Sequence, residues 1–423
     1  MSYKSTDKDL RDYKIKEMDS VSTSFCAAKW LYSIIWLYNG TTASCHHPHP
    51  HKIPLFEALK DPSNLHNTSV KKKCREQMLG GERPPECFYC WDVEDSKEDA
   101  ISDRTFKTGS FHLDSVHKLK DRDPQQNINP EILEIAFSRN CNLACAYCCP
   151  LFSTSWDKYD YSYNSPFSNQ ESPYVSIFWK WLAQIIDDLK LLRVTGGEPL
   201  LSKDFWKLLD WIILEKPEIN FSVNSNLCVS DALIDKLIAK GKQVEKFEVF
   251  TSCEAIGPQA EYLRDGMNFD KFWFNCEKII TECEVHHFCF MVTVNSLSVF
   301  SLIDFMEAVE KLKVKFGKDH PNFFINILHH PELMSVDILP LDVKHKQRDL
   351  LLNWYEERKE SPLFRVYEME SLKGLIDYLG NTNEPPPIIQ SKFKNFFNKY
   401  DKDRNKNLLE VFPLGEWYKE IDV

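Results

Sequence analysis

Three cysteines in the first half of the chain have a spacing that could bind an inorganic centre. Cys141, Cys145 and Cys148 form a C-x3-C-x2-C array, which places three thiols within eight residues. Zinc sites and iron–sulfur clusters normally take four protein ligands, so three thiols would leave one metal position open. An open position can bind a small molecule. The array therefore predicts a metal centre that takes part in chemistry, and its alternative is a set of ordinary buried or zinc-bound cysteines.

The residues before the array indicate which element would position it. Residues 131–137, Glu-Ile-Leu-Glu-Ile-Ala-Phe, alternate apolar and polar side chains like a half-buried strand. The array would then lie on the loop at the carboxyl end of this strand. Loops at that end of the strands are where α/β proteins keep their chemistry.

A second motif lies about fifty residues further on. Residues 191–200, Leu-Leu-Arg-Val-Thr-Gly-Gly-Glu-Pro-Leu, have the pattern of another strand, which ends in Gly196, Gly197 and Glu198. Two glycines let the backbone approach a ligand closely, and the carboxylate beside them can accept hydrogen bonds from an ammonium group. The motif indicates a second ligand-binding loop.

The two motifs together resemble the signature of the radical S-adenosylmethionine (radical SAM) enzymes, in which an aromatic residue, here Tyr147, precedes the last cysteine. The resemblance implies a [4Fe-4S] cluster on the three cysteines, whose fourth iron chelates the amino and carboxylate groups of S-adenosylmethionine (SAM). It also implies that one electron from the cluster cleaves SAM to a 5′-deoxyadenosyl radical, and that Gly196, Gly197 and Glu198 meet the amino end of SAM. A flavodoxin or a ferredoxin would supply the electron.

Strands and helices are expected to alternate from residue 131 to residue 340, the part of the chain that the resemblance covers. Six β/α units predict an α/β fold, namely a partial (β/α)6, TIM-like barrel. The expected domains are a cysteine-rich module at 1–105, a linker at 106–130, the barrel at 131–340 and a helical C-terminal extension at 341–423. The expected strands are 131–137, 191–195, 219–225, 246–252, 286–295 and 323–328, and the expected helices are 174–190, 203–215, 230–240, 268–283 and 300–315.

Polar residues follow several of these strands and are candidates for binding the ribose, carboxylate and adenine of SAM. They are Asn226, Ser252, Glu254 and Asn295, together with Arg264, which resembles an arginine often found after the fourth strand of the family. Each is equally compatible with an ordinary cap, turn or surface residue, because these residue types serve both purposes.

The N-terminal region carries its own cysteines. A β-prone segment around residues 30–38 and the turn Asn39-Gly40 predict a hairpin, residues 73–80 a helix, and Cys87 and Cys90 a C-x2-C knuckle. The pattern resembles the twitch or SPASM modules that bind an auxiliary iron–sulfur cluster, although here it precedes the barrel. The expected ligands are Cys45, Cys74, Cys87 and Cys90, with Cys26 as a substitute. Structural zinc is the alternative, and four histidines between positions 46 and 51 would lie on a loop near this centre.

Composition restricts the class of protein. The chain has 423 residues, 43% of them apolar and 27% charged, a net charge of −11 and fourteen cysteines. We expect a cytoplasmic protein with no membrane segment, whose cysteines serve metal or redox chemistry rather than disulfides. The acidic charge disfavours nucleic acid as a partner. Cysteines expected to pack without a role are Cys149, Cys228, Cys276, Cys283 and Cys289, while Cys253 could pack or contact substrate.

The sequence thus favours a radical SAM enzyme that abstracts hydrogen from an unidentified substrate. A peptide or protein is the substrate class with which auxiliary modules are associated. The main alternative is a metal-stabilised binding protein on an inactive barrel, and a nucleic-acid-modifying enzyme is a third hypothesis.

Overall fold

The computed structural model describes residues 7–97, 100–159, 166–167, 171–317 and 321–422. The chain divides into two compact units. The first contains residues 1–138 and 164–222, and the second contains residues 139–163 and 223–423. The division falls within strand β6 (Asn220–Ser225).

In the first unit the strand order is β3-β2-β1-β4-β5-β6. The predicted N-terminal hairpin is confirmed: β1 (Tyr32–Trp36) pairs with β2 (Thr41–Ala43) in antiparallel fashion across a turn in which Gly40 has a φ of 68°. β1 also pairs in parallel with β4 (Ile132–Ala136), and this pairing is not expected from the sequence. The remaining strands are β3 (His51–Lys52) and β5 (Leu191–Thr195), of which β5 runs parallel to β4.

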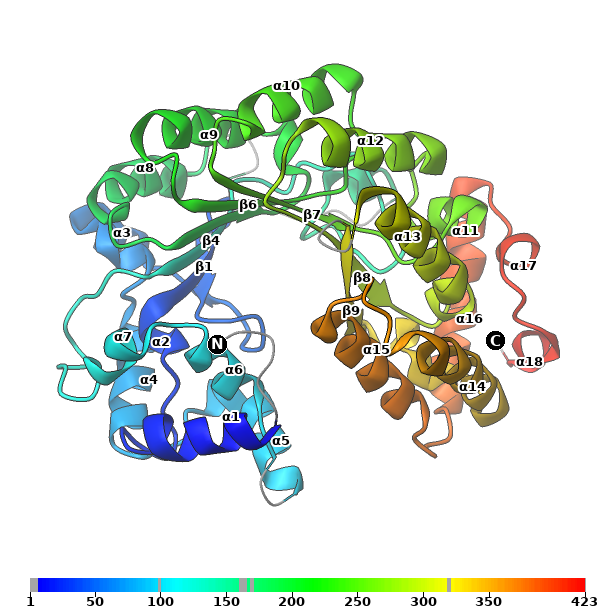
Figure 1. Ribbon diagram of the computed structural model, residues 1–423, viewed down its shortest axis with the longest axis horizontal. Helices are drawn as coiled ribbons and strands as arrows, with labels where there is room; N and C mark the ends of the chain where they lie inside the picture. The colour runs from blue at the N-terminus through cyan, green and yellow to red at the C-terminus, as the bar shows by residue number, and fades with distance from the viewer. Residues whose placement is uncertain (1–6, 98–99, 160–165, 168–170, 318–320, 423) are drawn as a thin grey trace. The chain divides into compact units, whose positions relative to one another are not determined.

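Two amphipathic helices lie along one side of these strands, α8 (Pro173–Ile185) and α9 (Lys203–Glu215) (Figure 1). Their buried faces include Trp181 and Leu208, which are completely excluded from solvent. The first unit also contains shorter helices: α1 (Asp7–Tyr13), η1 (Lys14–Met18), α2 (Ala28–Leu31), α3 (Leu55–Lys60), η2 (Pro62–Leu65), α4 (Ser69–Leu79), η3 (Pro85–Cys87), α5 (Phe88–Ser96), α6 (Asp103–Gly109) and α7 (Leu113–His117).

The helix predicted at 73–80 is confirmed as part of α4, but α6 and α7 occupy a segment for which the sequence predicts no regular structure. The reason lies in what α6 buries. Its buried residues are mainly polar and include Arg104 and Thr108, which bond to distant backbone groups instead of forming an apolar stripe. Hydrophobic periodicity therefore gives no signal there.

In the second unit the strand order is β6-β7-β8-β9, and β7, β8 and β9 are parallel. The strands are β7 (Lys246–Ser252), β8 (His287–Val294) and β9 (Asn322–Ile327). The helices between them are α10 (Asp231–Gly241), α11 (Gly257–Leu263), α12 (Phe269–Glu282) and α13 (Leu302–Phe316). The six predicted β/α units are present as β4 to β9 with their helices, and the predicted α/β fold class is confirmed.

The helical C-terminal region consists of α14 (Leu341–Arg358), α15 (Val366–Leu379), α16 (Pro387–Arg404), α17 (Leu408–Val411) and α18 (Glu416–Glu420). α15 packs against β9 (Figure 1). A fully buried ion pair fixes this contact, because Glu368 of α15 binds Lys313 of α13 at 3.0 Å and accepts a hydrogen bond from the amide of Phe323 in β9. No helix in the described part of the chain combines the length and apolarity needed to cross a membrane.

Candidate functional site

The three cysteines of the array lie on the loop that follows β4. Burial raises the pKa of Cys145 to about 12, although Arg264 lowers it and the Cys141 thiol raises it. Burial is also the main cause of the raised pKa of Cys148. The thiol of Cys145 raises that pKa further, and the thiol of Cys141 makes a smaller contribution. Three thiols that influence one another in this way cannot all ionise without a compensating positive charge, which a bound metal centre provides.

A strap of backbone holds the array in place. Ala144 and Ala146, on either side of Cys145, donate their amide hydrogens to the carbonyls of Asp265 and Leu263 at 2.9 and 2.7 Å. Gly266 follows with a φ of 98°, and a Cβ there would lie 3.0 Å from the carbonyl oxygen of Asn142. The strap at 263–266 therefore fixes the backbone of the array.

Three residues shortly after the array, Thr154, Ser155 and Trp156, form hydrogen bonds to its backbone. Thr154 Oγ1 accepts a hydrogen bond from the amide of Cys141 at 3.2 Å, and Ser155 donates to the Cys141 carbonyl at 2.7 Å. The indole of Trp156 donates to the carbonyl of Cys145 at 3.1 Å. Sequence analysis missed these residues; the run Ser-Thr-Ser-Trp beside the array is the signal that could have found them.

Two of the predicted cofactor-binding residues donate hydrogen bonds to the sulfurs. Asn226 Nδ2 lies 3.7 Å from Cys141 Sγ and 3.0 Å from the side-chain oxygen of Asn142. Arg264 Nη1 lies 3.9 Å from Cys145 Sγ. Donors to ligand sulfurs stabilise the thiolate form and tune the potential of an iron–sulfur cluster.

A buried carboxylate positions the aromatic residue of the array. Tyr147 donates its hydroxyl hydrogen to Glu254 Oε1 at 2.8 Å, while Arg264 Nε lies 3.2 Å from Glu254 Oε2. Burial raises the pKa of Glu254, and Arg264 and Tyr147 oppose that shift. Both carboxylate oxygens are thus used to orient Tyr147 and Arg264.

The other two strand-end candidates have different surroundings. Asn295 is completely buried, and its side-chain oxygen accepts hydrogen bonds from the amides of Leu297 and Ser298, both at 3.0 Å. These bonds close the turn before η6 (Ser298–Phe300). Ser252 is the partly exposed last residue of β7.

The Gly-Gly-Glu motif lies in the first unit, at the end of β5. Gly196 has a φ of 122°, and a Cβ there would lie 2.6 Å from the carbonyl oxygen of Ser138. Gly197 donates its amide hydrogen to the same oxygen at 3.1 Å. Glu198 is buried, and its carboxylate accepts a hydrogen bond from the amide of Leu200 at 2.9 Å, which caps η5 (Pro199–Leu201). The close approach of the chain after β4 already requires glycine at position 196.

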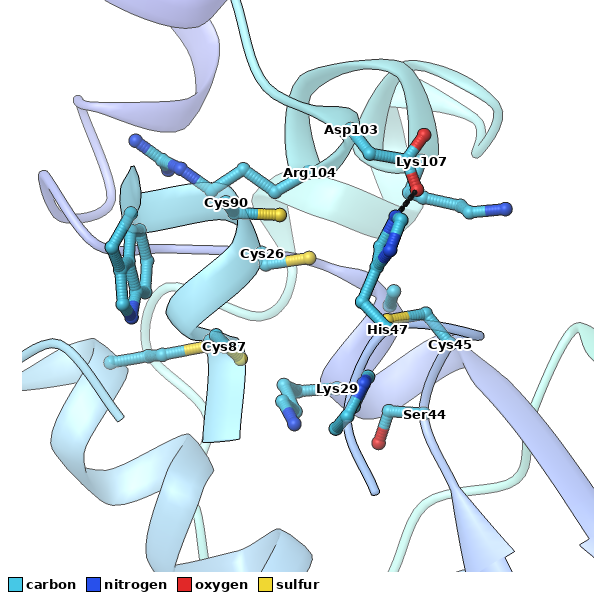
Figure 2. A pocket seen from close by; sticks show the side chains of 14 residues that line it. Cys26, Lys29, Ser44, Cys45, His47, Cys87, Cys90, Asp103, Arg104 and Lys107 are labelled. Carbon is cyan, nitrogen blue, oxygen red and sulfur yellow. Dashed lines mark hydrogen bonds and ion pairs between the residues drawn. The ribbon is translucent and has the colours of Figure 1, made fainter. Parts of the chain in front are cut away.

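The N-terminal cysteines of the first unit surround a cavity (Figure 2). Cys26, Cys45, Cys87 and Cys90 line it, and Cys74, which is buried in α4, does not. Among the described residues, no group of three or more His, Cys, Asp or Glu side chains is arranged to hold a single metal ion.

The neighbouring histidines bind separate partners instead of one another. Nε2 of His47 lies 2.9 Å from the carboxylate of Asp103, and that of His51 lies 2.8 Å from Thr68 Oγ1. Nε2 of His46 lies 3.5 Å from Glu134. His46, His47 and His49 lie on the loop after Cys45, as predicted, but His51 is the first residue of β3 and not part of that loop.

Curated relatives share a short segment of this chain. GTP 3',8-cyclase of Campylobacter lari is 30% identical over 96 residues, which are 23% of this chain and 27% of the relative. GTP 3',8-cyclase of Sulfurimonas denitrificans is 28% identical over 107 residues, 25% of this chain and 30% of the relative. The chain therefore spans less than a third of the length of these relatives. No protein-family model matches it.

Solved structures resemble the fold at low sequence identity. SuiB of Streptococcus suis has a TM-score of 0.41 at 13% identity and covers 71% of this chain and 67% of its own. The protein anSMEcpe with bound AdoMet has a TM-score of 0.38 at 17% identity, over 53% of this chain and 61% of its own.

The array and the Gly-Gly-Glu motif resemble the signature of the radical SAM enzymes, and the similarity to the GTP 3',8-cyclases supports that resemblance. The resemblance implies a [4Fe-4S] cluster and SAM as the cofactors. The chemistry of the donor set fits the cluster, because the loop carries three thiols and two of them already accept hydrogen bonds from side chains.

Proposed function

We propose that this chain cleaves SAM reductively and abstracts hydrogen from a substrate. The observation that carries the proposal is that Cys141, Cys145 and Cys148 lie on one loop whose backbone is hydrogen-bonded to residues 263–265, with side-chain donors on two of the sulfurs. When bound, the cluster supplies one electron that breaks a carbon–sulfur bond of SAM and generates a 5′-deoxyadenosyl radical.

The chain's own residues would hold the cluster and orient the groups around it. The three cysteines would bind the cluster, Asn226 and Arg264 would stabilise its sulfurs, and the tie between Glu254 and Tyr147 would keep the array from shifting. A site positioned in this way loses little entropy when the cofactor binds.

Gly196, Gly197 and Glu198 remain the proposed contacts for the amino end of SAM, and Ser252 a contact for the rest of the cofactor. Glu198 caps η5 through its Oε1 atom, and a carboxylate has the capacity for further hydrogen bonds. For Glu254 and Asn295 the contacts described above favour a supporting role in place of the predicted direct one.

For the substrate, we propose a peptide or protein, on the association of auxiliary cysteine modules with such substrates. The electron would come from a flavodoxin or a ferredoxin. The relatives act on GTP by their name, but the match spans too little of them to carry that substrate to this chain.

The test is anaerobic iron and sulfide analysis together with SAM cleavage under dithionite. Wild type should release 5′-deoxyadenosine, and a Cys141/Cys145/Cys148→Ala variant should lose about four irons and all cleavage. Cys149→Ala is the matched control, because this thiol adjoins the array but is not expected to bind iron, and it should keep both. A wild-type protein that holds only zinc and releases no 5′-deoxyadenosine would favour the alternative, a metal-stabilised binding protein.

A further inference from the structure

Helix α16 ends beside residues that hold the cysteine array, although it lies in the helical C-terminal region of the chain. Arg404, its last residue, makes the contact. Cζ of this arginine lies 3.6 Å from the ring centroid of Tyr159, 3.8 Å from that of Tyr400 and 4.7 Å from that of Trp156. Tyr159 and Trp156 belong to η4 (Thr154–Tyr159), which follows the array. Rings from two distant segments of the second unit therefore contact one guanidinium.

Arg404 reaches the backbone of the array by two routes. The first is Trp156, whose indole donates to the carbonyl of Cys145 at 3.1 Å. The second is the strap at 263–266. Nε of Arg404 lies 3.3 Å from Asp265 Oδ2, and the backbone carbonyl of Asp265 accepts the amide hydrogen of Ala144. The end of α16 is thus joined to residues on both sides of the array.

Further hydrogen bonds fix the end of α16 in this place. Tyr400 donates its hydroxyl hydrogen to the carbonyl of Tyr262 at 2.8 Å, and Tyr262 donates its own to Asp401 Oδ1 at 2.6 Å. The other oxygen of Asp401 accepts the amide hydrogen of Leu408 at 2.8 Å. Tyr262 and Tyr400 are both buried. Because Tyr262 directly precedes the strap, these bonds hold the helix end and the strap together.

The carboxylate of Asp265 is shared between two cations. Arg404 lies 3.3 Å from it and Lys406 lies 2.9 Å from it. The side chain of Arg404 is only 1% exposed, and its Nη2 atom has no hydrogen-bond partner among the described residues. A cation that is buried in this way costs free energy unless further negative charge lies close by.

The array lies within electrostatic reach of the same group of residues. Burial raises the pKa of Tyr400, Arg404 lowers it, and Asp265 and the Cys145 thiol raise it. Tyr400 is therefore close to the cation and also to a thiol of the array. A [4Fe-4S] cluster bound by three thiolates carries net negative charge, and a buried cation nearby would offset part of that charge.

We infer that Arg404 is a positioning residue of the cluster site, which holds Trp156 and the strap in place and offsets part of the negative charge of the cluster. The inference rests on the proposed function, because the array must bind a cluster for this charge to matter. Arginine suits the task, since its planar group packs on aromatic rings and stays charged when it is buried. Helix α16 would then be part of the site and not only a C-terminal extension.

The experiment measures the ratio of reduced to oxidised array cluster at a fixed potential, by electron paramagnetic resonance of the full chain. The signal of the array is the one that a Cys141/Cys145/Cys148→Ala variant lacks. Arg404→Met removes the charge, and the ratio should fall about tenfold, because a buried positive charge near the cluster favours its reduced form. Arg404→Lys keeps the charge and should stay within about threefold of wild type.

Lys399→Met is the matched control on the same helix. This lysine pairs with Asp403 and is 49% exposed, so solvent and salt screen its charge and the ratio should not change. The control should also keep its iron on gel filtration, whereas Arg404→Met should lose part of it because Trp156 and the strap lose a partner. Arg404→Gln repeats the test with a neutral planar side chain, should the methionine variant fail to fold.

The results separate failure of this inference from failure of the proposed function. An array signal in wild type whose ratio stays unchanged in Arg404→Met and Arg404→Gln would overturn the inference alone. An equal fall of the ratio in Arg404→Lys and Arg404→Met would show that packing matters and charge does not, which would overturn the charge-offsetting role. Absence of an array signal from wild type would refute the proposed function itself. The ratio is read without SAM cleavage, so it does not depend on turnover.

Discussion

Arg264 and Glu254 form an ion pair at the base of the cysteine array, with 3.2 Å between Nε and Oε2 and side chains only 5% and 0% exposed. The same arginine points Nη1 at the sulfur of Cys145, and the same carboxylate holds the hydroxyl of Tyr147. One buried acid therefore orients two side chains that contact or flank the proposed metal ligands.

Replacing Glu254 by glutamine should destabilise the array. The change leaves the buried Arg264 without its counter-charge, and losing one partner of a buried pair costs about 3 kcal/mol. We expect a corresponding fall in the free energy of unfolding and fewer irons retained after gel filtration. Glu356→Gln, which breaks an exposed pair with Lys359, should cost less than about 1 kcal/mol and leave the iron content unchanged. Equal losses in both variants would contradict the positioning role of Glu254.

Gly196→Ala should disrupt the end of β5. Its φ of 122° is unfavourable for alanine, and the new Cβ would lie 2.6 Å from a backbone oxygen, so about 2 kcal/mol or more of stability should be lost. Gly374→Ala is the control, because this helical position has no heavy atom within 4 Å of a Cβ. Alanine there should be neutral or stabilising by up to about 1 kcal/mol. Urea unfolding of the two variants measures the contrast, and a harmless Gly196→Ala would refute the steric argument.

The sequence predicts the elements of β4 to β9 well, because each strand and helix has its own hydrophobic period. It does not predict that β1 pairs in parallel with β4, since strands about a hundred residues apart pair through tertiary contacts that leave no local pattern. β1 therefore joins the same sheet as β4 instead of forming a hairpin on its own.

For the candidate sites, spacing predicts the array and the Gly-Gly-Glu motif but not the neighbours that fix them. Asn226 and Asn295 are the same residue type and each follows a strand, β6 and β8, yet one reaches a cysteine sulfur and the other closes a turn. Asparagine suits both tasks, so residue type cannot separate them. Cys26 is similar: only the path of the chain through α2 brings it to the cavity.

Lys313→Met should weaken the packing of α15 against α13 and β9. The change leaves the carboxylate of Glu368 buried without its cation, and a loss of about 3 kcal/mol is expected. The double variant Lys313→Met/Glu368→Gln should recover part of that loss, because glutamine removes the unpaired charge while its oxygen can still accept from the amide of Phe323. Additive losses in a double-mutant cycle of urea unfolding would show that the two residues do not interact.

The strap behind the array should make stability depend on pH through Asp265. Its carboxylate lies 2.9 Å from Lys406 Nζ and accepts the hydroxyl hydrogen of Tyr159 at 2.7 Å. Burial alone would raise the pKa of Asp265, but these partners outweigh it and the pKa is lowered.

A carboxyl whose folded-state pKa lies below its unfolded value stabilises the fold above the unfolded pKa, about 3.9, and loses that contribution as the pH falls through the folded pKa. Asp265→Asn should therefore cost about 1–2 kcal/mol at pH 7. The gap between wild type and variant, measured by urea unfolding at pH 7 and at pH 3, should narrow in acid. A gap that is constant across this range would mean that the ionised carboxylate is not what ties the strap to the C-terminal segment.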